Sequence, residues 1–267
     1  MCFEFDALPP DLPADRVVPS IRGGAAAEIL NLRAADGATF SAAFAQCPEP
    51  SESAVIILPD VRGHYRFYIE LAERFSEAGH HAIAIDYFGR TAGTGERSQD
   101  FDFMSNLAEA SPAVIQRDIA AARELVAERT RSQSFVTVGF CFGGANSFLA
   151  GTVPALGLRA AVGFYGTLDS SRTGMETMPS PIETAEETKV PIPGLFGGSD
   201  ELIPPEDIAR FEQKLSTAGV THELITYPGA PHSFFDRAAT EFAEESADAW
   251  RRVLDFLGQQ VREPAAS

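Results

Sequence analysis

The stretch VGFCFGG, residues 138–144, lies where an apolar run gives way to a segment with helical spacing. It places Cys141 between Gly139 and Gly143, in the pattern glycine, any residue, nucleophile, any residue, glycine. A nucleophile on a sharp strand-to-helix turn sits in strained backbone, and glycines two residues away on either side avoid a clash there. The alternative is a small buried cysteine in a tight connection, because free cysteine is among the most buried residue types.

A nucleophile at this turn gains two advantages. The thiol lies at the N-terminus of the following helix, where the helix dipole favours the thiolate. The backbone amide of Phe142 can point at a developing oxyanion.

Outward from this stretch, apolar runs alternate with segments of helical periodicity. Strands are predicted over residues 54–60, 81–88, 135–140, 160–166, 192–198 and 222–228. Helices are predicted over residues 65–79, 111–130 (with Ser111 as N-cap before a proline), 143–152, 205–218 and 238–260. Continuous apolar strands separated by helices indicate an α/β protein with a mainly parallel twisted sheet and helices on both faces.

An antiparallel hairpin is predicted to open the fold. EILNLRA and ATFSAAFA flank Asp36-Gly37, a pair expected to supply the positive φ angles of a tight turn. Because no linker divides the rest, we expect one domain over residues 25–267, preceded by a proline-rich arm over residues 1–24. The connections 89–111 and 167–190 are long enough to cover the pocket, since such sheets carry their sites at the carboxyl ends of the strands.

Asp200 and His232 each follow a predicted strand, and the carboxyl ends of the strands are where sheets of this kind carry their sites. They follow Cys141 in the order nucleophile, acid, histidine that hydrolases with this turn use. A histidine there can take the thiol proton, while the aspartate fixes its tautomer. The alternatives are that Asp200 caps the helix near Pro204, that Glu201 supplies the acid, or that His232 carries no chemistry. His64, after Gly63 near a strand end, is a candidate pocket residue.

The composition disfavours several classes of binding partner and site. With 38 acidic and 21 basic residues the net charge is −17, which opposes binding to nucleic acid or to anionic membranes. The three cysteines, Cys2, Cys47 and Cys141, form no CxxC pair, so neither a disulfide framework nor a zinc site is expected. The N-terminus lacks the basic region of a signal peptide, and no apolar run is long enough to span a membrane. We expect a cytoplasmic protein without cofactor or metal.

The motifs GFCFGG, GGSD (197–200) and APHSFF (230–235), in this order, resemble the dienelactone hydrolase family, carboxymethylenebutenolidase-like enzymes of the α/β-hydrolase fold. The resemblance covers about residues 30–260. It implies that Cys141 is the nucleophile, Asp200 the acid and His232 the base, with the amides of Val61 and Phe142 as oxyanion donors. It also implies no cofactor and a role in aromatic degradation.

Two family features are altered in this chain. Asp60, in LPDVRG, stands where family members carry the acidic residue that holds the resting thiol, but that residue is usually glutamate. Arg97 lies near one place where family members bind the substrate carboxylate. Asp236 stands where another cation is expected, and Arg237 comes one residue late. These differences bear on the dienelactone substrate rather than on the hydrolase class.

An aromatic wall is expected around the pocket, although the alternative is that most of these rings pack in the core. The candidates with substrate-binding roles are Tyr87, Phe103, Tyr165 and Phe234, besides Arg97 and Arg237, with Phe88 and Phe101 nearby.

The function predicted is hydrolysis of a small carboxylic ester or lactone, dienelactone-like, through a cysteine thioester, by a monomer or small homo-oligomer. The alternatives are a broad-specificity carboxylesterase of the same fold and a non-catalytic relative that binds a ligand. A redox sensor is weaker, because neither Cys2 nor Cys47 lies in a context that suggests a resolving partner.

Overall fold

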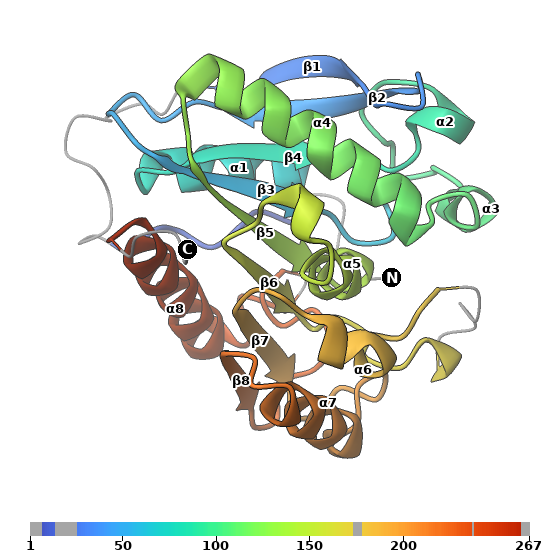
Figure 1. The fold of residues 1–267 in the computed structure, drawn as a ribbon, viewed down its shortest axis with the longest axis vertical. Coiled ribbons are helices and arrows are strands. Elements are labelled where there is room, and N and C mark those ends of the chain that lie inside the picture. The colour runs from blue at the N-terminus through green and yellow to red at the C-terminus, as the bar shows by residue number, and fades with distance from the viewer. Residues whose placement is uncertain (1–6, 14–25, 173–177, 237, 263–267) are drawn as a thin grey trace.

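The structure, a computed structural model, describes residues 7–13, 26–172, 178–236 and 238–262. Its centre is an eight-stranded sheet in the order β1-β2-β4-β3-β5-β6-β7-β8 (Figure 1). The strands are β1 (Glu28–Arg33), β2 (Thr39–Ala45), β3 (Ser53–Leu58), β4 (His81–Ile85), β5 (Ser134–Phe140), β6 (Ala160–Phe164), β7 (Ile192–Gly197) and β8 (His222–Tyr227). β1, β2 and β4 pair antiparallel, and every pair from β4 to β8 is parallel. The predicted mainly parallel α/β sheet is confirmed.

Helices separate the parallel strands as the periodicity predicted. The long ones are α1 (Arg66–Glu77), α4 (Pro112–Thr130), α5 (Phe142–Ala150), α7 (Pro205–Thr217) and α8 (Ala243–Arg262). The short ones are α2 (Gly89–Ala92), α3 (Phe103–Leu107), α6 (Pro181–Thr184) and the 3-10 turns η1 (Pro154–Leu156), η2 (Ser170–Arg172) and η3 (Ala185–Glu187).

The two faces of the sheet carry separate apolar layers. Along β3, Val55 and Ile57 belong to the layer beneath α1, whereas Ile56 belongs to the layer beneath α4. Since successive side chains of a strand point to opposite faces, α1 and α4 cover opposite faces, as Figure 1 shows. α8 shares the face of α1, because Trp250 meets Phe75 with ring centroids 4.7 Å apart.

Three details differ from the sequence-based expectations. In the hairpin between β1 and β2 only Gly37 has a positive φ, of 85°, because a turn closed by the Gly37 amide on the Ala34 carbonyl needs one left-handed residue rather than two. Ser111 is the N-cap of α4 but makes no side-chain capping bond. The last helix begins at Ala243 rather than at 238, because the chain after His232 first makes a series of turns.

The two connections are more structured than the sequence indicated. Residues 89–111 contain α2 and α3, and α3 is capped by Asp102, which accepts a bond from the Ser105 amide at 3.2 Å. Residues 167–190 contain α6 and two 3-10 turns, with 173–177 outside the described residues. Of the expected N-terminal arm, the structure describes only residues 7–13, which form neither helix nor strand. Within the described residues no helix combines the length and the apolar character needed to cross a bilayer.

Two buried histidines make the fold sensitive to acid. His80 lies just before β4, with Nδ1 2.9 Å from the Ser53 hydroxyl, and burial lowers its pKa to about 4. His64, after the end of β3, is fully buried, and burial lowers its pKa to about 4 as well. Both side chains are therefore neutral in the folded protein at neutral pH.

We expect the pH dependence of stability to weaken in His80→Asn. In the unfolded chain His80 has its ordinary pKa of 6.5 and binds a proton as the pH falls below that value. In the folded protein its pKa is about 4, so the side chain stays neutral until the pH approaches 4. Stability therefore falls as the pH falls, and between pH 7 and pH 5 wild type should lose about 2 kcal/mol more than the variant. Urea unfolding at the two pH values measures this difference, and equal losses in the two proteins would contradict it.

Candidate active site

Cys141 occupies the turn between β5 and α5 in a strained backbone conformation. Its φ is 53° and its ψ −114°, outside the regions that residues with a side chain ordinarily adopt. Its amide donates to the Phe164 carbonyl at 3.0 Å, and its carbonyl accepts from the Ala145 amide at 3.1 Å. The residue is 8% exposed. The backbone is thus held from both sides at the residue predicted to be the nucleophile.

The glycines around Cys141 are required by backbone contacts. A Cβ at Gly139 would lie 2.0 Å from the Gly143 carbonyl oxygen, and a Cβ at Gly143 would lie 2.0 Å from the Leu58 carbonyl oxygen. A Cβ at Gly144 would lie 2.8 Å from the Gly166 Cα. Without side chains, Gly139 and Gly143 allow the turn to close and the start of α5 to pack against the end of β3. Gly144 allows α5 to pack against the segment after β6.

This close approach brings the two predicted oxyanion donors into one neighbourhood. Phe142 is the first residue of α5, so its amide has no acceptor within the helix. Val61 lies in the turn after β3 that the Gly63 amide closes on the Asp60 carbonyl at 3.1 Å. Their use as donors to an oxyanion is a proposal that this proximity supports.

Asp200 and His232 form a short hydrogen bond. His232 Nδ1 donates to Asp200 Oδ2 at 2.6 Å, and the other carboxylate oxygen accepts from the Leu202 amide at 2.9 Å. The turns after β7 and β8 that carry the pair are joined by the Ser199 amide on the Ala230 carbonyl at 2.9 Å. The aspartate side chain is fully buried, and the histidine side chain is 15% exposed.

The geometry separates the alternatives for the acid. α7 begins at Pro205 with Pro204 as its N-cap, so Asp200 does not cap that helix. Glu201 is exposed, whereas Asp200 bonds to the histidine ring. The carboxylate next to His232 is therefore that of Asp200.

The buried carboxylate of Asp60 is bound by the residue two positions later. The Arg62 amide donates to Oδ1 at 2.8 Å, and Arg62 Nη2 lies 3.3 Å from Oδ2. The backbone amide of Asp60 donates to the Tyr68 hydroxyl at 3.0 Å. These bonds fix the turn that carries Val61, while a role of Asp60 as a switch for the thiol stays a prediction.

Of the predicted aromatic wall, Tyr165 contacts the histidine of the pair. Its ring centroid is 5.0 Å from that of His232, and its hydroxyl donates to Asp236 Oδ2 at 2.7 Å. Phe234 is fully buried and packs against Tyr165 with centroids 5.6 Å apart. The nearly buried Tyr87 donates its hydroxyl to the Pro59 carbonyl at 2.8 Å, and burial, followed by the charge of Asp60, raises its pKa.

Phe103 starts α3 and is half-buried. Tyr87, Tyr165 and Phe234 are buried and pack in the core, which agrees with the alternative that most of these rings are core residues. A substrate-binding role stays a proposal for Tyr165, which contacts the histidine ring, and for the half-buried Phe103.

In the structure the guanidinium of Arg97 is bound by other residues of the chain. Its Nε and Nη2 lie 3.2 and 2.5 Å from the two carboxylate oxygens of Asp86, and Nη2 also donates to the Gly93 carbonyl at 2.6 Å. The side chain is 7% exposed. We therefore propose a structural role for Arg97 in place of the predicted contact with substrate. Arg237 lies outside the described residues.

Asp86 is an organising residue that the sequence analysis passed over. It directly follows β4, which ends at Ile85, whereas the predicted strand runs to residue 88 and so places Asp86 inside the strand rather than at its end. Its carboxylate also accepts from the His64 amide at 3.2 Å and from the Phe88 amide at 3.0 Å. It thereby ties the turn after β3 to the connection after β4.

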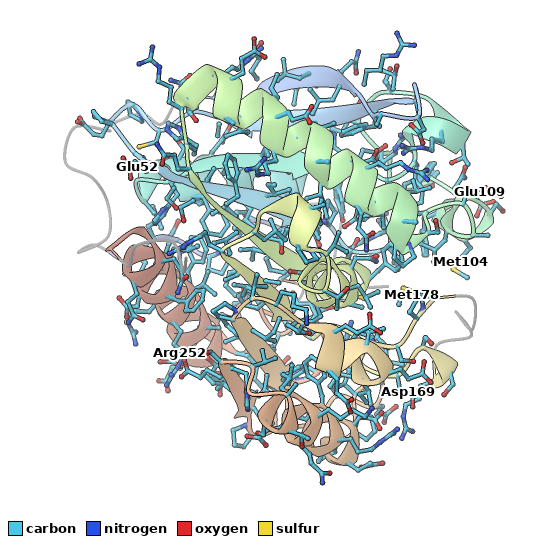
Figure 2. The ribbon with its side chains drawn as sticks, viewed as in Figure 1. Glu52, Met104, Glu109, Asp169, Met178 and Arg252 are labelled. Carbon is cyan, nitrogen blue, oxygen red and sulfur yellow. The ribbon has the colours of Figure 1, made fainter. Side chains whose placement is uncertain are left out.

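Two cavities lie away from the pair of Asp200 and His232. The larger, about 790 Å³, is lined by Cys47, Glu52 and His81, among others, and the smaller, about 500 Å³, by Asp169, Met178 and other residues next to α6. Figure 2 shows Glu52 at one end of the sheet and Asp169 and Met178 at the other. Among the described residues no group of three or more histidine, cysteine or acidic side chains could hold a metal ion.

The chain has clear relatives among known proteins. The model of the dienelactone hydrolase family matches residues 40–261. A protein of Yersinia pestis named "Putative carboxymethylenebutenolidase" is 29% identical over 212 residues, which are 77% of this chain and 77% of the relative. A protein of Escherichia coli strain K12 with the same name is 28% identical over 212 residues, 77% of this chain and 76% of the relative.

Solved structures show the same fold. A "Putative Dienelactone Hydrolase" of Klebsiella pneumoniae superposes with a TM-score of 0.74 at 24% identity, over 87% of this chain and 99% of that chain. The esterase Pf2001 of Pyrococcus furiosus superposes with a TM-score of 0.66 at 17% identity, over 94% of this chain and 96% of that chain. The sheet and its helices are those of the α/β-hydrolase fold.

The packing at Gly143 gives a test of the turn. We expect Gly143→Ala to lower the free energy of unfolding by more than about 3 kcal/mol, because the new methyl group would overlap the Leu58 carbonyl and force α5 away from β3. Gly151→Ala, at the end of the same helix, meets nothing closer than 3.1 Å and should change stability by less than about 1 kcal/mol. Urea unfolding compares the two, and similar losses would contradict the role assigned to Gly143.

Proposed function

The chain belongs to the dienelactone hydrolase family, and from that premise we propose that it hydrolyses a small carboxylic ester or lactone through a thioester formed on Cys141. The observation that carries the proposal is the 2.6 Å bond between His232 Nδ1 and Asp200 Oδ2. This bond leaves His232 Nε2 as the nitrogen for proton transfer. Cys141 directly follows β5, and His232 lies in the turns after β8, so both residues lie beyond the carboxyl ends of parallel strands, at the same edge of the sheet.

In the first half of the reaction the Cys141 sulfur attacks the ester carbonyl carbon. His232 Nε2 accepts the thiol proton, and Asp200 stabilises the resulting imidazolium through Nδ1. The carbonyl oxygen becomes an oxyanion, for which the amides of Phe142 and Val61 serve as donors. When the carbon–oxygen bond to the alcohol breaks, His232 returns the proton to the departing alkoxide, and the acyl group stays on sulfur.

In the second half, water hydrolyses the thioester. His232 takes a proton from the attacking water, and the same two amides receive the second oxyanion. The carbon–sulfur bond then breaks, the carboxylic acid leaves, and the proton on His232 returns to the thiolate. The enzyme returns to its starting state, and the atoms and protons of both steps balance without a cofactor.

The first test removes the thiol. Cys141→Ala should lower the turnover of 4-nitrophenyl acetate by about a thousandfold or more, because no acyl-enzyme can form. Cys47→Ala is the matched control, since Cys47 is also buried but lies at the large cavity, and it should retain activity within about twofold. Mass spectrometry of the quenched reaction should place an acetyl group on Cys141.

A wild-type protein that shows neither turnover nor acylation with small activated esters would favour the non-catalytic ligand-binding alternative. Turnover that survives in Cys141→Ala would overturn the assignment of the nucleophile.

The second test concerns the acid. Asp200→Asn should lower kcat by about a thousandfold while changing KM little, because the amide no longer fixes the tautomer of His232 or stabilises its charge. Glu201→Gln changes the exposed neighbouring carboxylate and should leave kcat within about twofold. Steady-state kinetics with 4-nitrophenyl acetate measures both variants, and a larger effect at Glu201 would reverse the assignment.

A further inference from the structure

Tyr165 directly follows β6 and is fully buried beside the histidine of the candidate site. Building on the function proposed above, we propose that Tyr165 is a positioning residue for His232. Its ring and its hydroxyl hold the imidazole where Nε2 takes the proton of the thiol. In this role the tyrosine acts on the reaction through the histidine.

The ring of Tyr165 restricts how the imidazole can turn. Its centroid is 5.0 Å from the centroid of the His232 ring, and the two planes are tilted by 59°. The bond from Nδ1 to Asp200 fixes one atom of the imidazole, and a ring fixed at one atom can still swing about it. Contact with Tyr165 opposes that swing. A base must hold its nitrogen within hydrogen-bond reach of the proton that it takes, so this restriction bears directly on catalysis.

The hydroxyl of Tyr165 joins the ring to the segment that carries the histidine. It donates to Asp236 Oδ2 at 2.7 Å, across 71 positions of the chain. Asp236 lies in the turn after His232, which its own amide closes on the Ser233 carbonyl at 3.2 Å. Phe234, in the same turn, packs edge-on against the tyrosine ring with centroids 5.6 Å apart. The segment that carries the histidine therefore contacts Tyr165 through three side chains.

The bond between the tyrosine and the aspartate is buried. Tyr165 is fully buried, and Asp236 is 3% exposed, so water competes little for either group. A buried hydroxyl needs an acceptor, because leaving it unpaired costs more than the bond itself gains. The bond therefore limits the positions that the tyrosine ring and the turn after the histidine can take relative to each other.

The backbone of the same residue is fixed next to the nucleophile. The Phe164 carbonyl accepts the Cys141 amide at 3.0 Å, and the Tyr165 amide donates to the Leu195 carbonyl at 2.7 Å. Tyr165 has a positive φ of 37°, a strained conformation that persists only where the surroundings hold it. The end of β6 thus holds the backbone of Cys141 and contacts the side chain of His232 with one short segment.

Tyr165→Phe removes the hydroxyl and keeps the ring. It should lower kcat for 4-nitrophenyl acetate by about tenfold or more and change KM by less than about twofold, because it acts on proton transfer rather than on substrate binding. Tyr227→Phe is the matched control. Tyr227 also packs against Phe234, with centroids 5.0 Å apart, but donates to Asp248 of α8 at 2.9 Å, so kcat should stay within about twofold.

The pH dependence of thiol alkylation separates positioning from a general loss of stability. A histidine held against the thiol stabilises the thiolate and lowers the pH at which iodoacetamide alkylates Cys141, which mass spectrometry follows separately from the other cysteines. In Tyr165→Phe the midpoint of the alkylation rate against pH should rise by about half a unit or more relative to wild type and to Tyr227→Phe. A variant that is only less stable keeps the wild-type midpoint.

Asp236→Leu tests the partner of the hydroxyl. It removes the acceptor at similar side-chain volume, and combining it with Tyr165→Phe gives a double-mutant cycle in which the other contacts of Asp236 cancel. In the Asp236→Leu background, Tyr165→Phe should lower kcat by less than about twofold, because the bond is already lost.

Equal kcat and equal alkylation midpoints in Tyr165→Phe and Tyr227→Phe overturn the inference, as does a change confined to KM. A loss in Tyr165→Phe that persists undiminished in the Asp236→Leu background overturns it as well. If Tyr165→Phe does not fold, Asp236→Leu must reproduce the lower kcat and the higher midpoint, and unchanged values there overturn the inference. If Asp236→Leu does not fold, the comparison of the two tyrosine variants decides.

A wild type without turnover, or turnover that survives in Cys141→Ala, instead overturns the proposed function and with it this inference. An active wild type whose activity depends on Cys141 but not on Tyr165 overturns the inference alone, so the two failures are distinguishable.

Discussion

The contact between the start of α5 and the end of β3 is the constraint on which the rest of the site depends. A Cβ at Gly143 would overlap the Leu58 carbonyl, so only glycine allows the helix to begin this close to the neighbouring strand. The approach forces the backbone of Cys141 into a positive φ and brings the amide of Phe142 toward the turn that holds Val61. One backbone contact thus sets the place of the thiol and of both proposed oxyanion donors. The strain at Cys141 is tolerated because hydrogen bonds to Phe164 and Ala145 hold its backbone from both sides.

Buried aspartates organise the surroundings of this turn. Asp86 binds Arg97 and the amides of His64 and Phe88, and Asp60 binds Arg62 and its amide. Each carboxylate satisfies several donors where the chain leaves the sheet, which stabilises loops that have few backbone partners of their own. Arg97 is held in this way by Asp86 and by the carbonyl of Gly93, so its guanidinium fixes the connection after β4.

The sequence predicted the larger elements well because their signals are local. The apolar periodicity located β3 to β8 and the long helices, and the order of Cys141, Asp200 and His232 brought Asp200 and His232 forward as candidates. Where the structure differs from the sequence-based prediction, the difference was decided by the geometry of individual turns. The single left-handed residue of the first hairpin, the short helix α3 and the late start of α8 all depend on details of turns that periodicity does not carry.

By itself, the sequence determined the class of fold and the identity of the candidate residues, because glycine spacing and strand patterning are properties of neighbours along the chain. Only the tertiary structure decided which acid contacts His232, since Asp200 and Glu201 are adjacent and differ in burial rather than in chemistry. It also decided that Arg97 belongs to Asp86, a pairing of residues eleven positions apart across a connection of irregular shape. Charge pairing depends on distances and on exclusion of water, and these quantities exist only once the chain is folded.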